Sequence, residues 1–586
     1  MFFAILTAAS FLINPIITEE ALKVTIRYNV LSYAMFSALF YMFYKKFYNK
    51  TKRYSSFSVI SVIFTLLLVL GYSFHYADSG VLVYGNIQYI AVSIIKLFGY
   101  NILINLLLNM AYEYTKNLKI KEIKSNKYID YFKKHPFKVS CIVMGIVYGI
   151  YLLAYYPGVI GYDPSYQIKE YMGIPNFYSE SINITSNTMI TQFNPVLHTL
   201  LIGFLFNIGH SLGNDNFGLF LYTLLQVCVY ISILSYTIKF MKDEGVPTKI
   251  LLFILGCYVL IPVFPFYAIC AFKDTYFSIF YVLFVIYFYK FIKYNATKKD
   301  TIMLIVSALL VCSFRHNGIH TVLLSMLFLL FRNKENLKKV FLSLVVVTCI
   351  HLGYKQVINY YEITPTSPRE LLSIPIQQTS ALIVHNENVI EYEDREIIGK
   401  VIDYDLVKEN YNPELSDPIK NTFNKDATTE DLINYLKVWF KYLFKKPITY
   451  IEATINNVYG YFYPDAQKWY FYYKKYEVLN EVGLDYHYVG PGILRAILMG
   501  YGFIFQYFPV IGLLTSIGFT TWIYIYLVGS LIESNKKKYI KLLLPAFLLI
   551  LVCIVGPINT YYRYILPYSM SLPMILALLY VNKNEK

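Results

Sequence analysis

Long apolar runs alternate with short polar or basic segments along most of the chain. Each run approaches the roughly 20 residues that a helix needs to cross the ~30 Å hydrocarbon core of a bilayer. The pattern therefore predicts an α-helical polytopic membrane protein with a transmembrane bundle of about 14 helices. The predicted membrane segments lie near residues 1–17, 28–44, 57–75, 88–112, 137–156, 217–238, 249–270, 275–291, 301–314, 318–331, 340–357, 510–531, 542–556 and 565–581.

Two of the polar segments are strongly basic and set the expected orientation. Segment 45–53 holds five Lys and Arg side chains, and 116–138 holds eight Lys. Because loops rich in Lys and Arg stay in the cytoplasm, we expect 157–195, which lies one helix further on, to be the first large outer loop. The next apolar segment, 196–212, is short and ends in glycines. We predict that it is re-entrant or lies in the outer leaflet, and that it does not cross the membrane.

Residues 358–495 form the one long polar stretch, with 14 Lys and Arg against 20 Asp and Glu. This stretch is too long for a plain loop, so we expect a folded soluble domain on the outer face, helical over 429–458. The chain is thus predicted to divide into N-terminal transmembrane helices (1–136), a transmembrane core (137–357), an extracytoplasmic domain (358–495) and C-terminal transmembrane helices (496–586).

Composition narrows the class of function. Apolar residues make up 56% of the chain and charged residues only 15%, with a formal net charge of +15. The charge divides into −6 over the predicted outer domain and +21 over the remainder. So sparse a positive charge does not form the dense basic surface of a nucleic-acid-binding protein. The expected surroundings are a lipid bilayer, and the expected location is a bacterial plasma membrane that the chain crosses many times.

The first outer loop opens with the sharpest polar motif, in which Asp163 follows a Tyr156-Pro157-Gly158 helix exit. A carboxylate held at the membrane surface could accept a proton from an acceptor hydroxyl, which requires fixed geometry and partial burial. Alternatively, Asp163 only caps the following helix, with Pro164 in its first turn.

Further polar motifs lie at the predicted outer ends of helices, and three of them bring cations. These are Lys273 beside Asp274, Arg315 before Asn317, and Arg563 in the last outer loop. Cations at such a depth need a partner, and an anionic lipid phosphate is one. The alternative is snorkelling or internal pairing, for example of Lys273 with Asp274.

The predicted outer domain carries Gln377 and Gln378 and a run of aromatic residues. Flat rings beside amide groups suit sugar binding, because rings pack on C–H faces and amides bond to hydroxyls. An aromatic belt at the membrane interface explains the same residues equally well. The run comprises Trp439, Tyr459, Tyr461, Tyr463, Trp469, Tyr470, Tyr472 and Tyr473.

In order, these motifs resemble the GT-C superfamily of polytopic membrane glycosyltransferases, and more narrowly an uncharacterised bacterial family of that type. The resemblance covers about 155–567. It rests on Tyr156-Pro157-Gly158 with Asp163 and Gln167, on Asn194-Pro195 with His198, and on Lys273-Asp274, Arg315-His316-Asn317-Gly318, Pro375-Ile376-Gln377-Gln378 and Asn559 to Tyr564.

This resemblance implies an inverting glycosyltransferase that uses a polyprenyl-phosphate-linked sugar and acts on the outer face of the membrane. The implied acceptor is a cell-envelope glycan, teichoic acid, lipid or protein. Asp163 would be the general base, and Asp274 occupies the second acidic position. Because Pro164 follows Asp163, there is no Asp-x-Asp pair, and a divalent metal is not expected. The implied substrate-binding residues are Gln167, His198, Lys273, Asp274, Arg315, Asn317, Gln377, Gln378 and Arg563.

Two other classes of function remain open on the sequence alone. One is a transporter or flippase for lipid-linked sugars, which typically shows inverted repeats and paired broken helices. The other is a glycan polymerase or ligase that uses a lipid-pyrophosphate donor.

Overall fold

The computed structural model describes residues 1–17, 22–26, 30–184, 186, 188–331, 335–466, 470–556 and 558–583. The chain is an α-helical membrane protein, 74% helical. Within the described residues, eight helical segments are long and apolar enough to cross a bilayer. They are α3 (Ser55–Ala77), α5 (Ile87–Asn117), α7 (Pro136–Ala154), α11 (Asp215–Asp243), α14 (Lys273–Lys293), α17 (Leu337–Tyr360), η6 with α26 (Lys537–Leu543 and Leu544–Val555) and α27 (Tyr562–Lys583).

Several predicted membrane segments form shorter helices. The segment expected over 1–17 is wrong as one helix, because its helix ends at Leu12 and Ile13–Ile17 pairs antiparallel with Leu22–Ile26. Asn14 and Pro15 interrupt the run there, and proline lacks the amide hydrogen that would continue a helix. The shorter elements are α1 (Phe2–Leu12), β1 (Ile13–Ile17), β2 (Leu22–Ile26), α2 (Val30–Phe47), α4 (Val81–Tyr84), α10 (Val196–Ser211), α12 (Thr248–Leu260), α13 (Val263–Ala268), α15 (Lys298–Phe314), α16 (Gly318–Leu330) and α25 (Ile517–Glu533).

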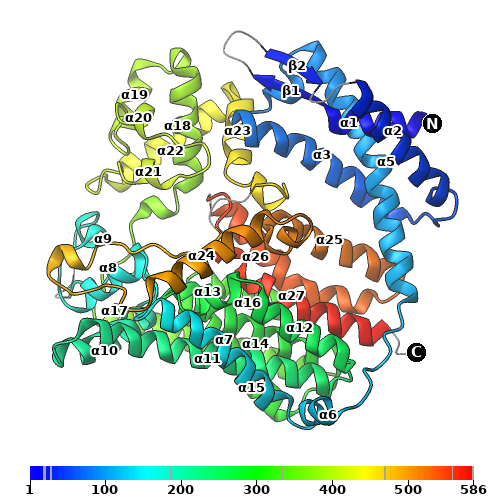
Figure 1. Ribbon diagram of the computed structural model, residues 1–586. Coiled ribbons are helices and arrows are strands. Elements are labelled where there is room, and N and C mark those ends of the chain that lie inside the picture. Colours follow the sequence, from blue (N-terminus) through cyan, green and yellow to red (C-terminus); the bar gives the residue numbers. More distant parts are fainter. Residues whose placement is uncertain are drawn as a thin grey trace.

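Helix α14 is the centre of the bundle. Nearly all its side chains are buried, from Asp274 to Phe291, and it packs against α11, α15 and α27. A helix that is apolar all round suits either a protein core or a membrane span, and the burial of α14 shows that it occupies the core of the bundle. Helices α1, α2, α3 and α5 pack on one another as a separate N-terminal group, and Figure 1 shows this group at the upper right, with α14 in the lower half.

A second hydrophobic core lies in the polar stretch after α17. The helix expected over 429–458 is confirmed as two helices that meet at Lys446-Pro447. Tyr435, Val438 and Tyr442 form the buried face of the first. The elements are η1 (Pro368–Glu370), α18 (Ser373–Asn386), η2 (Glu387–Val389), α19 (Tyr392–Gly399), α20 (Val407–Asn410), α21 (Asp417–Lys420), α22 (Thr429–Lys445) and α23 (Pro447–Asn456). We call this part the α18–α22 domain; it lies at the upper left of Figure 1.

The rest of the polar stretch packs on the membrane helices and does not join the α18–α22 domain. Tyr461, Tyr470, Leu479 and Tyr486 belong to the main hydrophobic core, because aromatic side chains favour burial over exposure in a loop. The remaining elements are α6 (Lys127–Lys134), α8 (Tyr162–Tyr171), α9 (Phe177–Glu180), η3 (Tyr459–Tyr461), η4 (Asn480–Val482), α24 (Gly492–Tyr507) and η5 (Ile511–Thr515).

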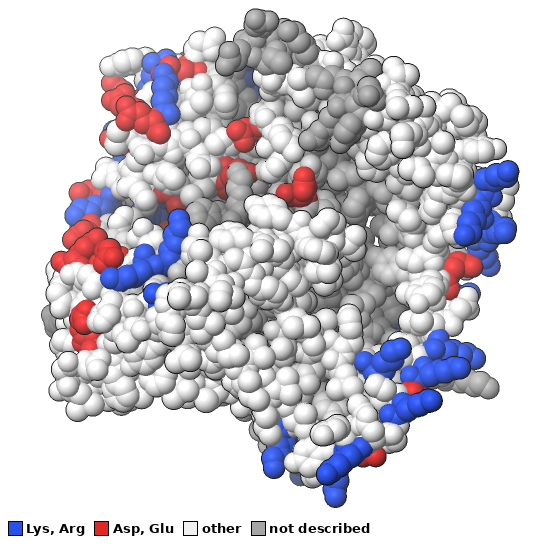
Figure 2. All heavy atoms as spheres, viewed as in Figure 1, with Lys and Arg blue, Asp and Glu red and all other residues white. Residues whose placement is uncertain are grey.

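Charge is unevenly distributed over the face shown in Figure 2. Lys and Arg gather at the right and lower right, near the ends of α2 and α5 and around α6, with few acidic residues among them. Around the α18–α22 domain and α8, both signs occur together. The molecule therefore has one basic end, formed by the segments 45–53 and 116–138 that the sequence marks as cytoplasmic.

Candidate functional site

The site is built where two extended segments meet before two helices. Val159 donates to the Ile269 carbonyl at 3.0 Å and accepts from the Ala271 amide at 2.8 Å, in a parallel pairing of Val159 with Cys270. Both segments then enter helices in the same direction, α8 at Tyr162 and α14 at Lys273. The pairing therefore brings the first turns of α8 and α14 together.

Asp163 lies in the first turn of α8 and makes ion pairs with two cations from distant parts of the sequence. Its Oδ2 accepts from Lys273 Nζ and from Arg563, each at 3.2 Å, and its Oδ1 accepts from the Tyr178 hydroxyl at 3.0 Å. The N-cap of α8 is Gly161, and the Asp163 side chain bonds to Tyr178, Lys273 and Arg563, so the alternative that Asp163 is merely a helix cap is wrong. Although burial alone would raise the pKa of Asp163, Lys273 and Arg563 hold that pKa well below its usual range. Asp163 is therefore ionised.

A second ion pair lies beside the first. Arg315 is 3.3 Å from Asp274, whose side chain is 1% exposed. Lys273 instead contacts Asp163 and Asn194 Oδ1, so the pairing of Lys273 with Asp274 is not formed. The Tyr564 ring lies under both guanidinium groups, 4.4 Å from Arg315 and 5.2 Å from Arg563. Three cations thus surround two carboxylates, which leaves an excess of positive charge in which an anion would be favoured.

Gln167 and His198 lie behind the ion pairs in a buried chain of hydrogen bonds. His198 Nδ1 lies 2.9 Å from Gln167 Oε1, and its Nε2 lies 2.7 Å from the Tyr222 hydroxyl. Tyr222 donates to Gln226, which donates to the carbonyls of Ala268 and Cys270 at 2.8 and 2.7 Å. These hydrogen bonds hold the loop that leads into Lys273. Gln167 and His198 therefore position the start of α14 and the Lys273 side chain.

Asn317 and the two glutamines are not seen to bond to the ion pairs among the described residues. Asn317 is exposed at the start of α16 and makes no capping bond. Gln377 donates to the carbonyls of Asn412 and Pro413. Gln378 donates to Thr454 Oγ1 and accepts from Trp439 Nε1. These bonds join α18 to the neighbouring segments of its domain.

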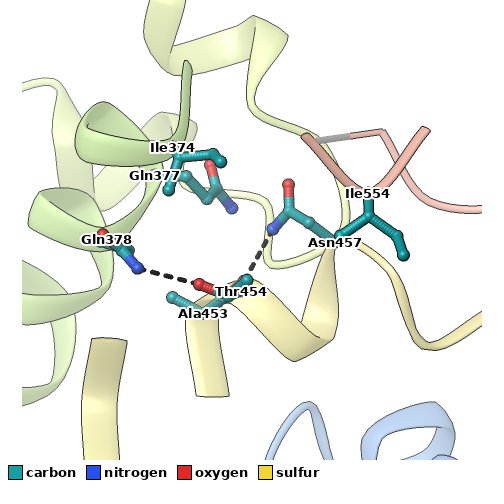
Figure 3. A pocket seen from close by; sticks show the side chains of 7 residues that line it. All are labelled: Ile374, Gln377, Gln378, Ala453, Thr454, Asn457 and Ile554. Atoms are coloured by element: carbon teal, nitrogen blue, oxygen red, sulfur yellow. Dashed lines mark hydrogen bonds between the residues drawn. The ribbon is translucent and has the colours of Figure 1, made fainter. Parts of the chain in front are cut away.

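Figure 3 shows the small cavity next to these glutamines. Gln377 and Asn457 point toward it from opposite sides. Its volume is about 10 Å³, which is the space for a single water molecule and not for a sugar ring. The amide groups thus have a structural role in this conformation.

Most of the predicted aromatic platform is buried. Tyr459, Tyr461, Tyr463 and Tyr470 are no more than 5% exposed, because their rings fill the contacts between helices. Trp469 lies outside the described residues. The rings around Arg563 are Phe272, Tyr561 and Tyr564. One member of the predicted run, Tyr472, joins them, because the centre of its ring lies 4.6 Å from that of Phe272.

The chain before α27 ties the site to the α18–α22 domain. Leu415 and Ile558 form an antiparallel bridge, and the Asn559 amide donates to the Glu414 carbonyl at 3.0 Å. Asn559 Oδ1 accepts from the Gly460 amide at 2.9 Å. Arg563 follows in the first turn of α27, so its position depends on both contacts.

Sequence reasoning missed two residues of the site. Tyr178 is one of many tyrosines, and no local pattern separates it from the others. Glu170 lies two helical turns after Asp163 in α8, with its side chain buried and bonded to Thr191 at 2.5 Å. The spacing of seven residues, which places Glu170 on the face of Asp163, could have indicated it. Among the described residues, no group of three or more His, Cys, Asp or Glu gathers as metal ligands would.

Burial raises the pKa of Glu170 from 4.5 to about 8. The folded protein therefore binds a proton that the unfolded chain releases, so the stability that Glu170 contributes is complete below pH 4.5 and is lost as the pH rises toward 8. Replacing Glu170 by Gln removes this dependence. We expect the variant to gain stability relative to the wild type between pH 5 and pH 8, by about 1.4 kcal/mol for each pH unit.

Thermal melting in detergent at both pH values measures the effect. Glu180→Gln, at an exposed position nearby, is the control and should track the wild type. A Glu170→Gln variant whose difference from the wild type is equal at the two pH values contradicts this prediction.

Fold and site together define a helical membrane protein with a charged cluster buried at the ends of its helices. The chain belongs to the family of unknown function DUF6020, which matches residues 43–586. The match includes every residue of the site. No curated protein matches the chain, and neither does any solved structure.

Proposed function

We propose that this protein is an inverting glycosyltransferase of the GT-C type, which transfers a sugar from a polyprenyl phosphate to a hydroxyl group of a cell-envelope acceptor. The observation that carries the proposal is the ionised Asp163 between Lys273 and Arg563, with Arg315 close by. A carboxylate and a cluster of cations are the two parts that transfer from a phosphate donor requires.

In the proposed reaction, the acceptor oxygen attacks the anomeric carbon of the donor sugar. The bond from that carbon to the phosphate oxygen breaks, and the polyprenyl phosphate leaves with the bonding electron pair. Asp163 takes the proton of the attacking hydroxyl. Lys273, Arg315 and Arg563 stabilise the negative charge on the departing phosphate, in a site where water is largely excluded.

The donor phosphate would take over some of the bonds that Asp163 now makes. Nε of Arg563 is buried and has no acceptor among the described residues, which leaves a donor for a phosphate oxygen. Once the phosphate holds Arg563 and Lys273, the Asp163 carboxylate is less tightly paired and becomes a stronger base. Phosphate binding thus prepares the base.

The proposal includes the topology expected from the sequence. The basic end of the molecule lies in the cytoplasm of a bacterial cell, and the α18–α22 domain and Asp163 lie on the outer face. Of the five shorter apolar helices, α12, α16 and α25 correspond to predicted membrane segments, and they extend the bundle beyond the eight spanning segments toward the expected number of about 14.

A transfer assay with the purified protein tests the proposed function. It uses a panel of polyprenyl-phosphate sugars and an envelope extract as acceptor, and thin-layer analysis identifies the released lipid. We expect polyprenyl monophosphate to be released. Release of pyrophosphate would instead indicate a polymerase or ligase, and movement of intact lipid-linked sugar across liposomes would indicate a flippase.

The topology has its own test, with single cysteines in a protein freed of native cysteines. Asp243 and Glu430 are exposed, at the end of α11 and the start of α22. An impermeant thiol reagent added to intact cells should label Glu430→Cys strongly and Asp243→Cys only after the cells are opened. The reverse pattern would place the Asp163 site in the cytoplasm and overturn the proposed use of an outer-face donor.

A further inference from the structure

A large groove lies between the N-terminal helices and the main bundle. It has a volume of about 1020 Å³, and parts of α5, α12, α25 and α27 line it. Its walls are mostly apolar. Side chains that line it include Phe253, Ile254, Ile523, Leu527, Leu572 and Leu576.

One end of this groove is basic. Lys116, Lys119, Lys121, Lys249 and Lys536 line it, and no Asp or Glu does so among the described residues. Lys119, Lys121 and Lys249 make no ion pair within the described part of the chain. Figure 2 shows the molecule hollowed between the lobe on the right and the rest, with Lys and Arg around the lower end of the hollow.

The basic end of the groove and the Asp163 site lie at opposite ends of α12. Lys249 is in the first turn of α12, and the chain passes through α12 and then α13 before it reaches Lys273. The basic end is thus on the side of segment 116–138. It lies away from the phosphate site of the proposed donor.

Size and surroundings indicate the kind of occupant. Pockets for small organic ligands are usually about 300–1,000 Å³. This groove is at the upper limit of that range and is bounded in part by membrane-spanning helices. Apolar walls with Lys119, Lys121 and Lys249 at one end match a molecule with long hydrocarbon chains and a phosphate head. Basic pockets between transmembrane helices on the cytoplasmic side bind anionic lipid head groups in this way.

We propose that the groove is a binding site for an anionic phospholipid of the inner leaflet. Its acyl chains lie between α5 and α27, and its phosphate contacts Lys119, Lys121 and Lys249. The lipid fills the space between the N-terminal helices and the bundle and so joins them. This site does not depend on the proposed glycosyltransferase activity.

Native mass spectrometry of the full-length protein in detergent tests this site, with phosphatidylglycerol as the probe and phosphatidylcholine as its zwitterionic counterpart. We expect tight binding of one phosphatidylglycerol and weaker binding of phosphatidylcholine. In the triple variant Lys119→Gln, Lys121→Gln, Lys249→Gln, the affinity for phosphatidylglycerol should fall by about 100-fold. The matched control replaces Lys45, Lys46 and Lys50 by Gln, and it should bind like the wild type.

A second pair of variants tests the apolar part of the groove. Leu576→Trp fills it from α27, and Leu551→Trp places the same ring on the exposed face of α26 outside the groove. Loss of the bound lipid in the first variant alone supports the site. Equal binding of both phospholipids, an equal loss in both Lys triples, or displacement by polyprenyl phosphate at lower concentration would overturn the assignment.

Discussion

Replacement of Asp163 by Asn is expected to lower kcat for sugar transfer by about 10³-fold, within the range that a positioned general base supplies. Asn keeps the shape of the side chain, and its Oδ1 can still accept the Tyr178 hydrogen bond. It has no basic oxygen for the proton of the acceptor. The measurement is the initial rate of transfer of a radiolabelled sugar at saturating donor.

The effect of Asp163→Asn on donor affinity distinguishes a general base from a residue that only stabilises the fold. Because Asp163 pairs with Lys273 and Arg563, its neutralisation frees both cations for the donor phosphate. We therefore expect KM for the donor to stay level or fall while kcat collapses. Tyr178→Phe, which removes only the 3.0 Å hydrogen bond, is the matched control and should keep most of the activity. An Asp163→Asn protein that turns over at the wild-type rate contradicts the assigned role.

Replacement of Arg315 by Met is expected to destabilise the protein by about 3 kcal/mol or more, because it leaves a buried charge without its partner. Arg315 lies 3.3 Å from Asp274, and only 14% and 1% of the two side chains are exposed. Met retains much of the apolar contact with Phe277 and Tyr564. Unfolding in mixed detergent and dodecyl sulfate measures the loss.

The double variant Arg315→Met, Asp274→Asn is the informative control. It removes both charges, so no unpaired charge stays buried, and it should be more stable than Arg315→Met alone. Losses that simply add would show that the two side chains do not interact.

The structure brings together the four basic and acidic residues that the sequence singled out, but the sequence did not indicate which of them pair. Asp163, Lys273, Arg315 and Arg563 stand out because charges are rare in an apolar chain and are expected at the same ends of helices. Their pairing follows from the bridge between Val159 and Cys270, 111 positions apart. Both segments of this bridge are apolar, and nothing in their sequences indicates that they pair with each other.

Gln377 and Gln378 are residues that the sequence singled out for substrate binding but that the structure uses within their own domain. Both were prominent as polar residues in a motif, yet their side chains bond within their own domain. An amide can serve a ligand or the backbone equally well, and only the tertiary contacts decide which. The same holds for the tyrosines, since a ring that could stack on a sugar can also fill a core.

The bridge between Leu415 and Ile558 has a mechanical consequence. It fastens the α18–α22 domain to the chain five residues before Arg563, and Glu414 and Asn559 reinforce the joint. If the domain tilts when it meets a partner, the guanidinium that holds Asp163 must shift with it. Cutting the domain away would thus alter the charged cluster as well. Asn559→Ala would remove only the side-chain bonds to Gly460 and Glu414, so it would loosen this connection while the backbone bridge stays in place.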